Sequence, residues 1–138
     1  MSSRLRKLEH FEKELGASSR GREILAVVRS HIDEVNELVN KNRTVMVAWQ
    51  RNHGPRFLMS AVDSGFDENT PVTKEIEGVT LQGLLLRMAD ALQQAGSPEL
   101  KASIARYAAP ALTAAEECVS VADVFGRIRA GTLAGQSS

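Results

Sequence analysis

Cysteine is nearly absent from this chain of 138 residues, because Cys118 is the only one. No disulfide can form within the chain, and a chain of this length can bury a core without disulfides or metal. Such cysteine usage is typical of a reducing compartment, so we expect a cytoplasmic protein. Cys118 lies on the apolar face of a predicted helix, where we expect a buried and unreactive thiol.

Long apolar segments and common functional motifs are also missing. No apolar run approaches the roughly 20 residues that cross a bilayer, and residues 1–13 lack the apolar core of a signal peptide. We therefore expect no membrane association. The chain contains no Gly-x-Ser-x-Gly, P-loop or Gly-x-Gly-x-x-Gly motif, and no metal motif such as Cys-x-x-Cys or His-Glu-x-x-His. We predict no metal and no cofactor.

Aromatic residues make up only 4% of the chain, whereas apolar residues make up 43% and charged residues 25%. The latter two fractions are ordinary for a folded globular protein. Few aromatics with abundant Ala and Leu favour helices packed on helices over a β-sandwich. We predict one all-α domain over residues 1–138, a compact bundle of about five to seven helices.

The net charge is zero, but the charged residues are unevenly distributed along the chain. Residues 1–56 hold 11 Lys and Arg against 7 Asp and Glu, and residues 57–138 hold 6 against 10. The asymmetry is compatible with a face that attracts anions or with two halves that neutralise each other.

The N-terminal half carries three helical patterns. Apolar residues at helical spacing predict a helix from Ser3 to Leu15, which we expect at the periphery of the domain within residues 1–16. Ser18 or Ser19 can cap a long helix that runs to Lys41. Residues 43–51 fit either a strand or a helix, and we interpret them as a helix because a lone strand has no partner. Pro55 suits the start of the next helix.

The C-terminal half carries clearer boundary signals. Residues 63–78 predict one long irregular loop with a short β-like segment near 72–76. Thr80 caps a helix that Gly96 ends, and Ser97-Pro98-Glu99 begins another. Pro110 predicts the end of that helix. Thr113 and Glu116 predict a capping box for the last helix, which Gly131 ends, and residues 132–138 predict a frayed tail.

The candidate site is a basic segment within residues 38–62, which contain no acidic residue and the only tryptophan. A Gly-Pro helix start offers free N–H groups, arginines offer forked donors for phosphate or carboxylate, and histidine can transfer a proton. The alternative is a basic turn whose arginines pair with Asp63, Asp67 or Glu68. The ligand-binding candidates are Arg43, Trp49, Arg51, Asn52, His53 and Arg56.

Three functions follow from these patterns. The first is a non-enzymatic helical module that binds an anionic ligand or an acidic partner surface through residues 43–56. The second is a small enzyme that uses His53 as acid or base, the weak catalytic candidate, with Arg51 and Arg56 as anion clamps. The third is a DNA-associated regulator, although nucleic-acid binding is disfavoured by the neutral net charge. The predicted second, fifth and last helices are so apolar that we also expect self-association, as a homodimer.

Overall fold

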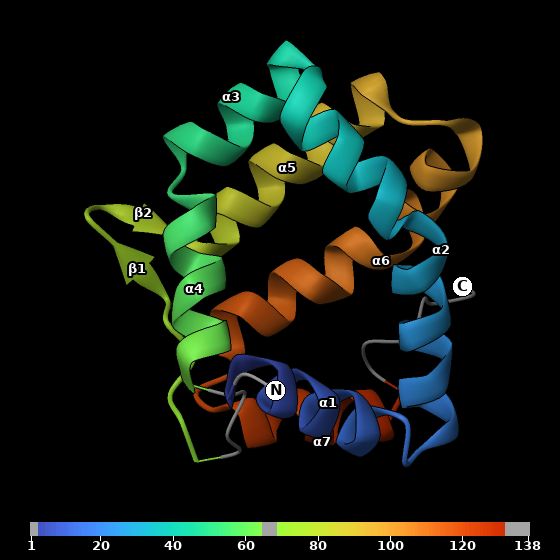
Figure 1. Cartoon of the computed structure of the whole chain (residues 1–138), viewed down its shortest axis with the longest axis vertical. Helices are drawn as coiled ribbons and strands as arrows, with labels where there is room; N and C mark the ends of the chain where they lie inside the picture. The colour runs from blue at the N-terminus through green and yellow to red at the C-terminus, as the bar shows by residue number, and fades with distance from the viewer. Residues whose placement is uncertain (1–2, 65–68, 132–138) are drawn as a thin grey trace.

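The computed structural model describes residues 3–64 and 69–131, which form seven helices and one short hairpin (Figure 1). The helices are α1 (Ser3–Leu15), α2 (Ser19–Lys41), α3 (Arg43–Arg51), α4 (Gly54–Ser64), α5 (Leu81–Ala95), α6 (Pro98–Glu117) and α7 (Val121–Arg129). The strands β1 (Glu75–Ile76) and β2 (Val79–Thr80) pair antiparallel. This architecture confirms the all-α prediction. The predicted tail 132–138 lies outside the described residues.

Side-chain caps begin the helices where the sequence predicts them. The Ser18 hydroxyl accepts a hydrogen bond from the Gly21 N–H at 3.0 Å, which starts α2. Thr80 does the same for α5 and Ser97 for α6. Each cap satisfies a backbone donor that has no partner within its helix, so these signals act over a single turn.

The ambiguous segment 43–51 is a helix, as we interpret it from the sequence. Asn42 lies between α2 and α3, and its side-chain oxygen accepts from the Val45 N–H at 3.1 Å. Val45 is completely buried in the main core cluster, together with Phe57 and residues of α5 and α6. One capping residue and one buried valine therefore decide the conformation of this short helix.

The predicted boundary at Pro110 is wrong, because α6 continues through this proline to Glu117. Proline removes one backbone hydrogen bond, but α6 packs along α5, and Ala114 and Ala115 beyond the proline are buried. The predicted capping box at Thr113 is wrong for the same reason. The last helix starts after Ser120, whose hydroxyl caps the Asp123 N–H in the capping box that the structure does contain.

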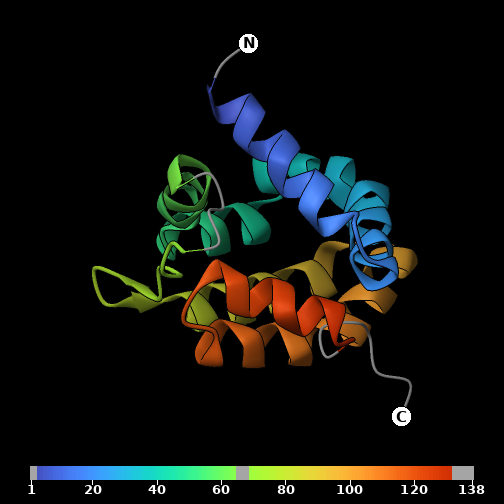
Figure 2. The ribbon, with the colours of Figure 1, turned by 90° about the horizontal axis from the view of Figure 1, so that it is seen from below.

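The predicted irregular segment 63–78 is partly ordered. Helix α4 extends to Ser64, and Pro71 forms an isolated β-bridge with Ser120. The hairpin of β1 and β2 turns through Glu77 and Gly78, both with positive φ. It projects from the helical body in both views (Figures 1 and 2). Residues 65–68 lie outside the described part of the chain.

A second, smaller core cluster joins the two ends of the chain. Leu15 of α1 is buried against Phe125 and Ile128 of α7. The ring of Phe11 lies 5.5 Å from that of Phe125, centroid to centroid. The helix that we expect at the periphery is thus packed on the C-terminal helix. Within the described residues, no helix combines the length and apolar composition that a bilayer crossing requires.

Candidate functional site

Two of the predicted site residues face the interior of the protein. Trp49 packs against the main core cluster, and a Cβ atom placed on Gly54 would fall 2.2 Å from its ring. Asn52 is buried, and its side-chain amide donates to the Ala48 carbonyl at 2.7 Å. Both side chains therefore shape the corner between α3 and α4. Gly54 is required there because the indole ring occupies the place of a side chain.

Two other predicted residues meet at the hairpin. An Arg56 guanidinium nitrogen lies 3.1 Å from one carboxylate oxygen of Glu77, and His53 Nε2 lies 3.8 Å from the other. His53 and Glu77 are the two non-glycine residues with positive φ in the described chain, at 57° and 47°. Glu77 is a partner that the sequence does not suggest, since we expect Asp63, Asp67 or Glu68 in this role.

The remaining two candidates lie apart from that contact. Arg43 and Arg51 are exposed at opposite ends of α3, about 12 Å apart along a helix of this length. The structure thus brings together His53 and Arg56, with Glu77 between them, and spreads the other positive charges. Anion binding by residues 43–56 stays a prediction, as do catalysis by His53 and DNA binding.

A second candidate site lies elsewhere, as an open groove of about 420 Å³ between α2, α5 and α6. One face of α2 forms a wall, with lining residues three or four positions apart that extend about 16 Å along its axis. These residues of α2 are Ile24, Val27, Val28, His31, Ile32 and Val35. We call this cavity the α2 groove.

The opposite wall of the α2 groove is formed by α5 and α6, which pack closely as an antiparallel pair around Gly96 and Ser97 (Figure 1). Helix α5 contributes only apolar side chains, namely Leu85, Met88, Ala89 and Leu92. Helix α6 contributes the small side chains of Ala108 and Ala111 among larger apolar ones. The lining contains no Asp, Glu, Lys or Arg.

Polar side chains bridge α2 and α6 along the groove. Glu34 accepts hydrogen bonds from the Ser97 N–H at 2.7 Å and from its hydroxyl at 2.8 Å. His31 Nε2 lies 2.8 Å from the Ser103 hydroxyl oxygen. The two Ser97 donors, with a smaller contribution from His31, hold the pKa of Glu34 below its ordinary value. These contacts join α2 to α6 through side chains, and His31 and Ser103 also line the groove.

The rim of the α2 groove exposes large apolar side chains. Val28 and Ile32 both line the groove and are 49% and 44% exposed. They stand one turn apart on α2, so they form a continuous apolar ridge beside the opening. The sequence signals that the helices carry more apolar surface than a small domain can bury. It does not show where that surplus lies, because the groove joins α2 to residues 50 or more positions further along the chain.

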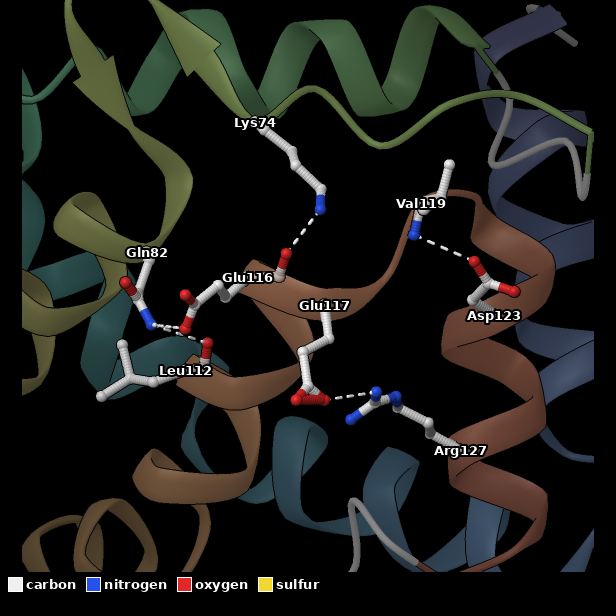
Figure 3. Close-up of polar contacts among 8 residues, drawn as sticks. All are labelled: Lys74, Gln82, Leu112, Glu116, Glu117, Val119, Asp123 and Arg127. Carbon is white, nitrogen blue, oxygen red and sulfur yellow. Dashed lines mark hydrogen bonds and ion pairs between the residues drawn. The ribbon is translucent and has the colours of Figure 1, made fainter.

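A second polar cluster, where α6 meets α7, is satisfied by its own chain (Figure 3). Arg127 pairs with Glu117 at 2.7 Å, and the Lys74 ammonium donates to the Glu116 carbonyl. The Val119 and Ser120 N–H groups donate to Asp123 and lower its pKa. These contacts fasten the start of α7 to the end of α6, so the cluster has a structural role.

Cys118 lies within this junction. Its side chain is 1% exposed, and burial raises the pKa of its thiol. A raised pKa favours the unreactive thiol over the thiolate. In the described part of the chain, no group of three or more His, Cys, Asp and Glu side chains is placed to hold a metal ion.

Comparisons of the chain with known protein families, with curated proteins and with solved structures find no match in any of the three. Any functional assignment therefore depends on the geometry of the chain itself. The α2 groove is distinguished by its apolar lining and by the exposed apolar side chains at its rim.

Proposed function

We propose that this protein is a non-enzymatic binding module that holds a small apolar ligand in the α2 groove. The observation that supports this proposal is the groove itself, about 420 Å³ of space walled almost wholly by apolar side chains. Ligand sites of small molecules commonly occupy roughly 300–1,000 Å³ and are mostly apolar with a few polar groups. The α2 groove agrees with this description in volume and in composition.

The physical reason is that the fold leaves apolar surface unburied there. Protein interiors are close-packed and hold few voids larger than a water molecule. An apolar ligand would remove the groove surface from water, at about 25 cal/mol for each Å² buried. Helix α5 is anchored in the main core cluster by Leu84, Met88, Ala91 and Leu92, two of which also line the groove. Binding therefore does not have to build the site.

A groove-filling substitution tests this proposal. Ala108 lines the groove, whereas Ala105 lies exposed on the same helix. We expect Nile red, a neutral apolar dye, to bind the wild-type protein and the Ala105→Phe control saturably. In Ala108→Phe the added ring occupies the groove, so the affinity should fall about tenfold or more, a loss of about 1.4 kcal/mol or more.

The measurement is a fluorescence titration of each protein at fixed dye concentration. Equal affinity in Ala108→Phe and Ala105→Phe would place the dye outside the groove and contradict the proposal. So would the failure of both Nile red and dodecanol to bind the folded wild type.

A second candidate function is anion binding at the corner between α3 and α4. The observation that favours it is the Glu77 carboxylate, which lies between Arg56 and His53. An acidic partner surface could take the place of Glu77. We would measure the thermal shift produced by phosphate and citrate in wild type and in the Arg51→Ala/Arg56→Ala double variant. A shift of equal size in both proteins argues against this site.

We also propose that the protein forms a homodimer and works in a reducing compartment. The ridge of Val28 and Ile32 supports a homodimer, because exposed apolar ridges commonly pack on a partner. Sedimentation equilibrium of wild type and Ile32→Lys would detect it, and a wild type that stays monomeric at all concentrations would exclude it. The buried, unpaired thiol of Cys118 supports a reducing compartment such as the cytoplasm.

A further inference from the structure

We propose that the natural ligand of the α2 groove is a single-chain carboxylic acid whose head group is bound by His31, Ser103 and Tyr107. This inference rests on the proposed function of the groove. It adds the chemistry of the ligand, which neither the volume nor the apolar walls define.

The polar side chains that line the groove come from α2 and α6 only. His31 comes from α2, and Ser103 and Tyr107 are four residues apart on α6, so both point from the same face of that helix. Helix α5 contributes no polar side chain to the lining. The groove therefore has one side with hydrogen-bonding groups and one apolar side, which matches a ligand with one polar end and one apolar chain.

The polar side chains of the groove are mainly hydrogen-bond donors. The imidazole and the two hydroxyls are hydrogen-bond donors, and no carboxylate lines the groove. The Tyr107 hydroxyl already donates to Glu23 Oε1 at 3.4 Å, a long hydrogen bond that a ligand carboxylate would replace. When the imidazole N–H donates to the Ser103 oxygen across their 2.8 Å contact, the Ser103 hydroxyl is left to donate to a ligand. A set of donors favours a head group rich in acceptor oxygens, and a carboxylate accepts up to four hydrogen bonds.

The rim of the groove next to Tyr107 carries a net positive charge. Glu23 there lies between two arginines, Arg20 at 3.8 Å and Arg106 at 3.4 Å. These three groups sum to one positive charge. The Arg106 guanidinium also lies 5.4 Å from the centre of the Tyr107 ring. Glu34, towards the other end of the α2–α6 contact, is already held by two Ser97 donors. An anionic head group is therefore attracted to the end of the groove where Tyr107 lies.

The test compares three ligands with the same chain and different heads: dodecanoate, dodecanol and dodecylammonium. Calorimetry would give their affinities for wild type, His31→Leu, Ser103→Ala and the control His10→Leu, an exposed histidine of α1. We expect dodecanoate to bind wild type best. We expect each groove variant to weaken it about tenfold or more, because hydrogen bonds to a charged group are the strong ones. The affinity for dodecanol should change by less than about threefold, and His10→Leu should leave the affinity for all three ligands unchanged.

A second measurement separates direct contact from a change in fold. The carbon NMR signal of carboxyl-labelled dodecanoate should differ between bound wild type and bound Ser103→Ala, a variant that removes one oxygen and keeps the helix former alanine. Thermal unfolding of each variant confirms that it is folded.

The outcomes distinguish this inference from the proposed function. If dodecanol and dodecanoate bind alike and the groove variants weaken both equally, the groove is a ligand site but the carboxylate inference is wrong. If dodecylammonium binds best, the groove selects a cationic head group, which Glu23 at the rim would bind, and the inference is again wrong. If none of the three binds, or if Ala108→Phe binds all of them as wild type does, the proposed function itself fails.

Discussion

The corner between α3 and α4 and the α2 groove differ in how far the chain satisfies its own chemistry. At the corner, the polar side chains that stand out in the sequence find partners in the fold, since Asn52 binds Ala48 and Arg56 pairs with Glu77. In the groove, ordinary apolar residues are left without a partner, and Val28 and Ile32 remain about half exposed. A site for another molecule is better indicated by what a fold leaves unsatisfied than by unusual residues.

The largest loss in the free energy of unfolding should come from a substitution in the core beneath the corner. Phe57 is 6% exposed and packs in the main core cluster. Replacing it with alanine leaves a cavity, so Phe57→Ala should lower the free energy of unfolding by about 3–5 kcal/mol. Ile32→Ala, which trims a half-exposed groove residue, should cost less than about 1.5 kcal/mol. Urea denaturation of both variants measures this, and equal losses would mean that the groove wall is as well packed as the core.

The next largest change in stability should distinguish two alanines of α6. Ala115 is 8% exposed, whereas Ala108 lines the groove. A ring inserted into packed surroundings costs about 1–3 kcal/mol, so Ala115→Phe should be destabilised by that amount. Ala108→Phe should stay within about 1 kcal/mol of wild type because the groove has room for the ring. A strongly destabilised Ala108→Phe would show that the space closes in solution.

A third effect concerns the bridge from α2 to α6 and its dependence on pH. The folded-state pKa of Glu34 is lowered by Ser97. A lowered pKa stabilises the fold above the unfolded-state value of about 4.3, and this contribution is lost as pH falls through the folded-state value. Glu34→Gln should therefore be less stable than wild type at neutral pH. The difference should shrink in acid, as thermal melts at a series of pH values would record. A difference that does not vary with pH would contradict this role of Glu34.

The smallest effect should come from the contact of the hairpin with the corner. Arg56 and Glu77 are 54% and 66% exposed, and exposed ion pairs contribute at most about 1 kcal/mol. Arg56→Ala should therefore change stability by less than that, and added salt should reduce the difference further. Arg43→Ala is the matched control on α3. A loss of several kcal/mol in Arg56→Ala would mean that the corner depends on the hairpin for its structure.

The sequence by itself determined the helices whose boundaries depend on one turn of chain. Ser18, Thr80 and Ser97 each cap a helix through a donor three residues away, so local pattern was sufficient. The capping box of Ser120 and Asp123 was equally local and could have been found. Pro110 nevertheless favours an earlier helix boundary in the sequence, and the structure does not have that boundary.

The tertiary structure decided whatever joins distant segments. It carried α6 through Pro110, because packing against α5 outweighs one lost hydrogen bond. It brought Glu77, which is 21 positions away from Arg56 in the chain, to the basic corner. It also opened the groove where α2 meets α6, across pairs such as His31 and Ser103, which are 72 positions apart. Helix formation depends on neighbours in the chain. The surface that a helix leaves uncovered depends on every other helix around it.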